Sequence, residues 1–174
     1  MREAGTRRSP YGRFALAWHR RAFGAAALLS AGLLLASCAP PPPKPPVVTQ
    51  VSITLAAGAD ANPDARGRAS PLTVRVYALK TTGAFEAADF FSLFEKDQAT
   101  LGAEMIQREE LLLRPGESKK IEMTLQPDAK AIGVMAAYRD LEHARWREVR
   151  ALEVGKPLNL GLNFGARQIR VEAK

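Results

Sequence analysis

Three oxygen-bearing side chains, Asp60, Asn62 and Asp64, occupy alternate positions, which is the spacing of the first ligands in a calcium-binding loop. The rest of that pattern is missing. Ala65 stands where such a loop requires glycine, and Pro71 stands where a glutamate would complete the coordination. We therefore expect no metal site in this segment.

Nucleophilic catalysis needs a base placed beside its nucleophile, and this sequence offers few candidates. His19 lies in the N-terminal segment, and His143 lies in a polar turn spanning residues 140–144. No serine lies in a nucleophile-elbow motif, and no glycine-rich phosphate loop is present. The adjacent Glu109 and Glu110 are typical of a solvated face. We expect neither an enzyme nor a bound cofactor or small-molecule substrate.

The single cysteine, Cys38, follows an uncharged stretch from Ala22 to Ser37 that comes directly after Arg20 and Arg21. This stretch is shorter than the roughly 20 residues of a membrane-spanning helix, but it fits the apolar part of an export signal. Its end, Leu35-Ala36-Ser37-Cys38, resembles the bacterial lipobox. That resemblance implies cleavage before Cys38 and acylation of its new terminus. The alternative is a stray cysteine beside an uncleaved anchor.

Residues 1–37 are therefore predicted to be a lipoprotein signal peptide. Several acyl chains on Cys38 would hold the protein on a bilayer, since each buried methylene contributes ~0.8 kcal/mol. Ala39 stands where, by resemblance to the lipoprotein sorting rule, an aspartate would retain the protein in the inner membrane, so the outer membrane is favoured. The segment before the apolar stretch is long for a Sec signal, and Arg20-Arg21-Ala22-Phe23 resembles a twin-arginine motif. The export route and the start codon both stay open.

The net charge of +7 is concentrated in the predicted signal peptide, which holds six arginines and one acidic residue. The remaining chain is close to neutral, which argues against a nucleic-acid partner. Residues 40–46 contain six prolines and favour an extended polyproline spacer of roughly 20 Å. We assign 38–50 to the acylated cysteine and its tether, and 51–174 to one folded domain.

The dominant hydrophobic period in that domain is two, as in strands with one wet face. Short alternating runs separated by turn residues predict about seven strands and a β-sandwich. One segment, 85–102, predicts a short helix or two, with Ala87, Phe90, Phe91 and Phe94 on a single core-facing stripe. An uninterrupted apolar run, 131–138, predicts a strand covered on both faces. The remaining strands are expected at 50–55, 72–78, 111–113, 121–125, 158–162 and 168–171.

A long polar segment, 59–71, separates the first two predicted strands. Taken as a hairpin loop it exceeds the usual 2 to 5 residues. It carries both signs of charge and no apolar anchor. Such a loop on a rigid sheet is typical of partner recognition, and a floppy solvated loop is the alternative.

A set of short motifs in this order is similar to the TssJ (SciN-like) outer-membrane lipoproteins of type VI secretion systems. The motifs run through nearly the whole domain: Asn62-Pro63-Asp64, Gly67-Arg68, Ser70-Pro71, Val74-Arg75-Val76-Tyr77-Ala78-Leu79, Phe85, Ala88-Asp89-Phe90-Phe91-Ser92-Leu93, Leu101-Gly102, Pro115-Gly116, Ile132-Gly133-Val134, Ala136-Ala137-Tyr138-Arg139-Asp140 and Trp146-Arg147.

The resemblance implies a transthyretin-like β-sandwich with added helices and a protruding loop between the first two strands. It also implies a role in tethering the periplasmic C-terminal part of TssM to the outer membrane, in a complex that includes TssL. Tyr138 and Trp146 are interpreted as core or sandwich-edge residues, and interface anchors are the alternative. A different periplasm-facing lipoprotein, such as a small-ligand carrier or an assembly pilotin, is the alternative function. The family's partner-binding loop maps by position onto Asp60, Asn62, Pro63, Asp64, Arg66, Gly67, Arg68 and Ser70.

Overall fold

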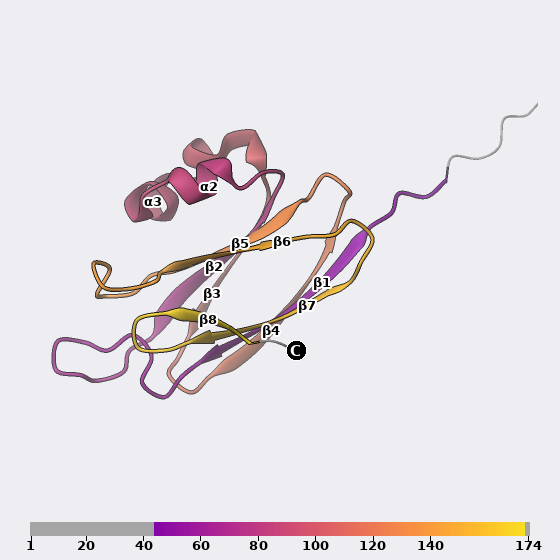
Figure 1. Cartoon of the computed structure of the whole chain (residues 1–174). Helices are drawn as coiled ribbons and strands as arrows, with labels where there is room; N and C mark the ends of the chain where they lie inside the picture. The colour runs from indigo at the N-terminus through magenta and orange to yellow at the C-terminus, as the bar shows by residue number, and fades with distance from the viewer. Residues whose placement is uncertain (1–43, 173–174) are drawn as a thin grey trace, which may run out of the picture. The chain divides into compact units, whose positions relative to one another are not determined.

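Two four-stranded sheets stack face to face in the computed structural model, which describes residues 44–172 (Figure 1). One sheet has the order β4-β1-β7-β8 and the other β3-β2-β5-β6. Neighbouring strands are antiparallel except for the parallel pair β1 and β7. The predicted β-sandwich is therefore confirmed. The strands are β1 (Thr49–Ala57), β2 (Leu72–Leu79), β3 (Met105–Leu113), β4 (Ser118–Leu125), β5 (Ala131–Ala136), β6 (Arg147–Ala151), β7 (Leu158–Phe164) and β8 (Ile169–Glu172).

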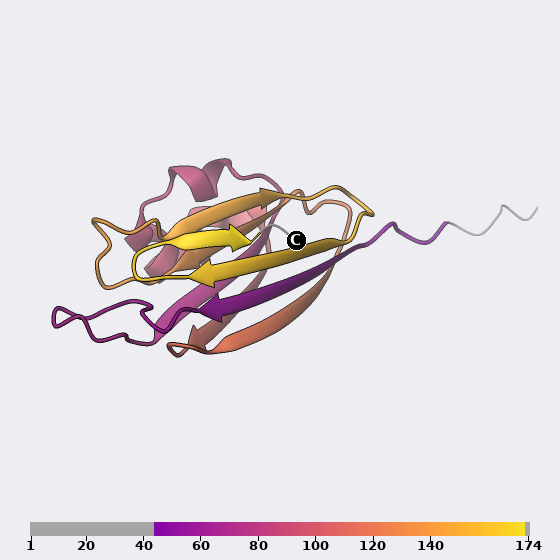
Figure 2. The same ribbon diagram turned by 60° about the horizontal axis from the view of Figure 1, so that its bottom comes forward.

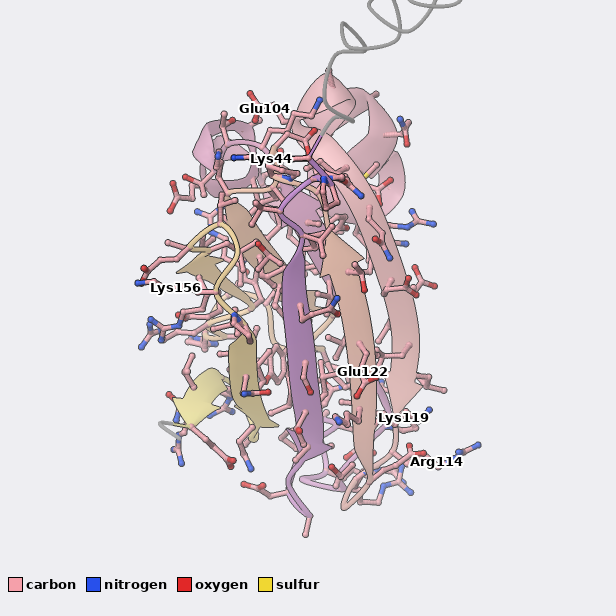
Figure 3. The ribbon with its side chains drawn as sticks, turned by 90° about the vertical axis from the view of Figure 1, so that its right-hand side faces the viewer. Lys44, Glu104, Arg114, Lys119, Glu122 and Lys156 are labelled. Atoms are coloured by element: carbon pink, nitrogen blue, oxygen red, sulfur yellow. The ribbon has the colours of Figure 1, made fainter. Side chains whose placement is uncertain are left out.

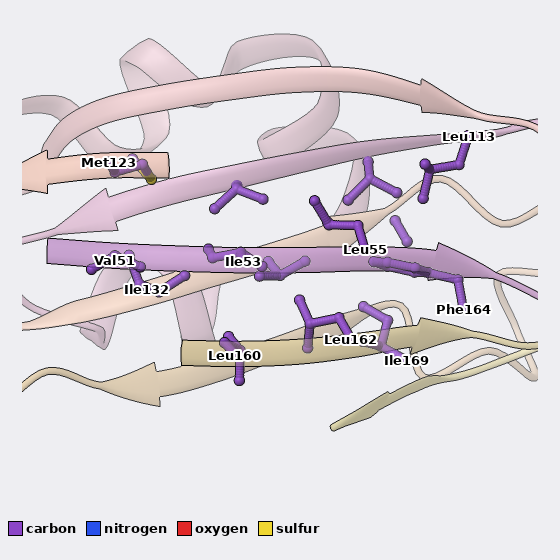
Figure 4. Packing of buried hydrophobic residues seen from close by; sticks show 14 of the residues in the cluster. Val51, Ile53, Leu55, Leu113, Met123, Ile132, Leu160, Leu162, Phe164 and Ile169 are labelled. Carbon is purple, nitrogen blue, oxygen red and sulfur yellow. The ribbon is translucent and has the colours of Figure 1, made fainter. Parts of the chain in front are cut away.

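The core between the sheets is built around β1, which lies between β4 and β7. Its alternating sequence turns Val51, Ile53 and Leu55 inward, where each is at most 2% exposed. They pack with residues of β7 and of the opposite sheet (Figure 4). Burying an aliphatic side chain of this size stabilises the fold by about 1.5–3 kcal/mol. The strand is thus a rigid support for whatever follows its C-terminal end.

Strand β5 is buried along its whole length, as the apolar run predicts. One face lies against the other sheet, and the opposite face lies under the helices (Figure 1). The packing is so close that a Cβ on Gly133 would lie 2.9 Å from Leu79 Cδ1 of β2 and 3.1 Å from the Phe85 ring of α2. A side chain larger than hydrogen at Gly133 would therefore force Leu79 and Phe85 to shift.

The helical segment consists of α2 (Gly83–Ala87), α3 (Phe90–Leu101) and the short 3-10 turn η3 (Gly102–Glu104). Asp89 caps α3 by accepting a hydrogen bond from the backbone N–H of Ser92 at 2.9 Å. The predicted core-facing stripe is only partly present. Phe90 and Phe94 are half-buried against the core, but Ala87 is exposed and Phe91 is 61% exposed. Phe85 and Leu93 are buried. The chain breaks between the two helices and leaves helical geometry again at Lys96, so one helical period does not describe the segment.

A buried aspartate and two arginines fix α3 to the second sheet. Asp97, on α3, accepts from Arg108 Nη1 at 2.7 Å and forms an ion pair with Arg75 at 3.4 Å. Arg75 also donates to the carbonyls of Leu93 and Phe94, close to the kink. Burial alone would raise the pKa of Asp97, but the hydrogen bond and positive charge of Arg108 hold it below its ordinary value.

Two further differences concern strand boundaries. The sequence pattern did not predict β6, so the described chain has eight strands where about seven were expected. Thr49 and Gln50, which we assigned to the tether, belong to β1. The predicted turn at 114–117 is present, with Gly116 at φ 78° and the N–H of Glu117 donating to the Arg114 carbonyl at 2.9 Å.

Candidate interaction loop

The segment between β1 and β2 projects as a narrow finger beyond the end of the sandwich (Figure 2). The assumption that β1 and β2 form a hairpin is wrong, because the two strands lie in different sheets. The finger still has paired backbone. The N–H of Ser70 donates to the Ala61 carbonyl at 3.0 Å, and the N–H of Asp64 donates to the Arg68 carbonyl at 2.8 Å. These bonds give the loop one defined path.

Asn62 holds the stem of the finger to the rest of the domain. Its Nδ2 donates to the Pro71 carbonyl at 2.8 Å, and its Oδ1 accepts from the backbone N–H of Arg139 at 2.8 Å. The residue is 3% exposed and adopts φ 49°, a left-handed conformation that asparagine tolerates better than most residues. Both halves of the amide are therefore occupied by backbone groups.

Asp64 organises the tip. Its Oδ1 accepts from the backbone N–H groups of Arg66 and Arg68, both at 2.9 Å, and its Oδ2 pairs with the Arg68 guanidinium at 2.7 Å. The hydrogen bond from the Arg68 backbone is the main reason that the pKa of Asp64 lies below its ordinary value. Gly67, at φ 78°, completes the turn by donating to the Asp64 carbonyl at 2.9 Å.

The eight residues expected from the resemblance differ in how accessible they are to a partner. Asn62 and Ser70 are buried in the stem, and Asp64 is used by the tip itself. Solvent reaches Asp60, Arg66, Gly67 and Arg68, and Pro63 is half-buried. The oxygens of Asn62 and Asp64 accept hydrogen bonds within the domain and are not arranged as the ligands of a calcium loop. Across the described residues 44–172, no group of three or more metal-binding side chains comes together.

Two neighbouring loops, 137–146 and 165–168, lie beside the finger, and the sequence analysis did not assign them to the site. Asp140 joins them, because its Oδ2 accepts from Arg167 Nε at 2.7 Å and its Oδ1 lies 2.7 Å from His143 Nδ1. The hydrogen bond from His143 is the main cause of the lowered pKa of Asp140. Charged residues are ordinary in polar turns, so no local pattern in the sequence sets these residues apart.

These three loops border two open hollows. The first, of about 660 Å³, lies between the finger and the other loops and includes Gly67, Arg139 and Arg167. The second, of about 450 Å³, includes Asp60, Arg145 and again Arg167.

Among the helices of residues 44–172, none has the length and the apolar character that a membrane span needs.

A model of a protein family described as "Type VI secretion lipoprotein, VasD, EvfM, TssJ, VC_A0113" matches residues 49–173. The chain belongs to this family. Among solved structures, the chain is similar to the type VI secretion lipoprotein TssJ1 from Pseudomonas aeruginosa. The identity is 42%, the match covers 75% of this chain and 98% of that one, and the TM-score is 0.71.

Two further structures are similar. Serratia marcescens Lip, a membrane bound component of the type VI secretion system, is 27% identical over 75% of this chain and 99% of that one, with a TM-score of 0.69. A chain in the structure of the T6SS protein TssM C-terminal domain from EAEC is 25% identical over 72% of this chain and 98% of that one, with a TM-score of 0.60. No curated protein was found to match this chain.

Membership of the type VI secretion lipoprotein family confirms the resemblance and the transthyretin-like sandwich. The family consists of structural, membrane-bound lipoproteins that are not known as enzymes. The lipobox and Cys38 lie outside the described residues, so the acylation of Cys38 stays a prediction. The assignment of partner contacts to the finger also stays a prediction.

Proposed function

We propose that this lipoprotein anchors a trans-envelope secretion complex to the outer membrane by binding the periplasmic C-terminal region of TssM. In this proposal acyl chains on Cys38 hold the chain in the outer membrane, facing the periplasm, and TssL belongs to the same complex. The finger from Asp60 to Ser70 makes the protein contact.

The observation that carries the proposal is the position of the finger in the domain. The described chain enters the sandwich at Thr49, at one end of β1, and the finger follows Ala57, at the other end (Figure 1). Nine extended residues span about 30 Å, so the finger points away from the side on which the tether enters. Its backbone bonds mean that little conformational entropy is lost when a partner binds.

The similar chain in the TssM C-terminal domain structure supports this choice of partner. Membrane attachment is supported by the description of Lip as a membrane bound component of the same secretion system.

The contact is tested by replacing the two exposed arginines of the tip, Arg66→Ala together with Arg68→Ala. Gly67 is retained, because a side chain at φ 78° would strain the turn. We expect binding to the TssM periplasmic region to weaken about tenfold, as for interface arginines generally. Calorimetric titration of the purified lipoprotein measures the affinity, and circular dichroism checks the fold.

The matched control removes two exposed lysines at the other end of the domain, Lys130→Ala together with Lys156→Ala. This variant loses the same charge and should bind like wild type. If the arginine variant stays folded and binds TssM as tightly as the control does, the finger is not the contact.

The anchor is tested by Cys38→Ser. We expect the variant to fractionate with soluble periplasmic proteins, to incorporate no labelled palmitate and to leave secretion unsupported. A Cys38→Ser chain that still sediments with outer membranes would rule out acyl anchoring at this residue.

A further inference from the structure

Arginines at the finger end of the domain differ from those elsewhere in the described chain because many of them lack an acidic partner. On the second sheet, Arg75 and Arg108 share Asp97, Arg147 caps the carbonyl of Ala88, and Arg150 pairs with Glu148. Within residues 44–172, a second set has neither an ion pair nor a side-chain hydrogen bond. Its members lie in loops at the finger end, or in the case of Arg145 in an isolated β-bridge to Gln168. These are Arg66, Arg114, Arg139 and Arg145.

Figure 3 places one member of this set. Arg114, in the turn between β3 and β4, lies at one end of the sandwich, and Lys44 and Glu104 lie at the other. The turn that carries Arg114 is joined to the start of the finger, since the N–H of Gly116 donates to the Ala57 carbonyl at 3.0 Å.

The two hollows beside the finger adjoin each other across Arg167, which borders both. Arg139 borders the first hollow, and Arg145 and Arg170 border the second. Arg170 forms no ion pair among residues 44–172; once the Gln168 amide is turned over, its neutral oxygen accepts from Arg170 Nε at 2.8 Å. We call these two adjoining hollows the arginine groove.

The carboxylates of the arginine groove do not neutralise it. Asp64 is occupied by Arg68 and two backbone N–H groups, and Asp140 is occupied by Arg167 and His143. Asp60 is the remaining acid that borders the groove. Arg139, Arg145 and Arg170 therefore outnumber the one carboxylate without a partner.

We propose that the arginine groove binds an acidic, extended segment of the protein that the finger engages. Guanidinium groups match carboxylates in geometry and bind them in pairs of hydrogen bonds. Arg139 and Arg145 have no ion pair to break, so binding a carboxylate there costs little beyond side-chain ordering. Two hollows in a row suit a chain segment better than a compact ligand. This proposal rests on the proposed function for the identity of the partner.

The groove opens at the end of β1 opposite to the entry of the chain, so we assign its ligand to protein rather than to the phosphates of the anchoring membrane. Charge attraction of this kind speeds association and is weakened by salt.

The first test uses a fluorescein-labelled hexaglutamate peptide and the full lipoprotein in detergent, with fluorescence anisotropy as the readout. We expect saturable binding that weakens with added salt and falls about tenfold or more in Arg145→Glu/Arg170→Glu. Lys130→Glu alone, and Lys130→Glu/Lys156→Glu, which reverses two exposed charges at the other end as the groove variant does at this one, should both bind like wild type. No binding by wild type, or equal binding by the groove variant, overturns the proposal. Binding to phosphatidylglycerol vesicles without binding to the peptide also overturns it, in favour of a lipid surface.

The second test titrates the same variants with the TssM periplasmic region. Loss of affinity in Arg145→Glu/Arg170→Glu but not in Lys130→Glu supports the groove as a second contact beside the finger. If the groove variant binds TssM as wild type does, the groove proposal is wrong and the proposed function stands. If wild type does not bind TssM but the peptide result holds, the proposed partner is wrong and the acidic-segment groove stands.

Discussion

Asn62 shows how a side chain that looks like a ligand in the sequence becomes part of the scaffold. Its amide bridges the Pro71 carbonyl and the Arg139 N–H, so one residue connects the finger to the loop that carries a groove arginine. Asp64 acts similarly within the tip, where its oxygens accept from the N–H groups of Arg66 and Arg68. The geometry of the exposed arginines therefore depends on residues whose polar atoms are already used within the domain.

Replacing Asn62 with alanine should lower the free energy of unfolding by about 2–3 kcal/mol, because two buried backbone groups lose their partners. The alanine would also have to adopt φ 49°. Urea unfolding followed by the fluorescence of Trp146 measures the change. Arg66→Ala, in the same loop but exposed, should leave the midpoint unchanged. Equal midpoints for Asn62→Ala and wild type would show that the amide bridge contributes nothing.

The spacing of Asp60, Asn62 and Asp64 could not disclose these roles from sequence alone. The spacing matches a metal loop at its start, and only the flanking Ala65 and Pro71 argue against one. Which backbone groups Asn62 reaches depends on Arg139, which is 77 positions away. A contact at that separation leaves no local pattern, and for the same reason Arg139 and Arg145 were not assigned to the site.

At the scale of elements, the strands that were predicted are those whose local sequence dictates their structure. The alternation in β1 and the apolar run in β5 predicted both strands, because burial of one face or two leaves a regular pattern. Strand β6 has the sequence REVRA and leaves no such pattern. Its strand conformation comes from pairing with β5, from Ala131 with Ala151 to Met135 with Arg147. The Lys96 kink likewise depends on tertiary bonds from Arg75 to nearby carbonyls.

Attachment of α3 through Asp97 makes stability depend on pH. The pKa of Asp97 in the fold lies below the ordinary value of 3.8, so its stabilising contribution is fully present above that pH. The contribution is lost as pH falls below 3.8 and the carboxylate takes up a proton in both states. We expect Asp97→Asn to lower the free energy of unfolding by about 3 kcal/mol at neutral pH, since Arg108 and the half-buried Arg75 lose their shared charge partner.

The difference in free energy of unfolding between wild type and Asp97→Asn should therefore be smaller at pH 3 than at pH 7, as measured by urea unfolding. Glu122→Gln is the control, because the exposed pair of Glu122 with Lys120 holds no element in place. An equal difference in free energy of unfolding at pH 7 and pH 3 would mean that the charge of Asp97 does not hold α3 on the sheet.

At the scale of the whole molecule, the sandwich separates two interaction ends with a rigid body. The chain enters beside Thr49, whose Oγ1 accepts from the backbone N–H of Gly155 at 2.9 Å. The finger and the arginine groove lie at the far end of β1. A pull applied between these ends is directed along β1, which pairs with β4 on one side and β7 on the other. Such pairing on both sides fits the proposed role, in which the domain links a membrane to a protein partner.

The same arrangement predicts where the folded unit begins. A chain starting at Pro45 should unfold at the same urea concentration as one starting at Ala39, because residues 44–47 are exposed and the compact unit begins at Pro45. A chain starting at Ser52 should lose about 3 kcal/mol or more, because it lacks the buried Val51 and the hydrogen bond to Thr49. Urea titration of the three chains, monitored by Trp146 fluorescence, measures both differences. A large loss on removing only residues 39–44 would show that the proline segment packs on the sandwich and is part of the folded unit.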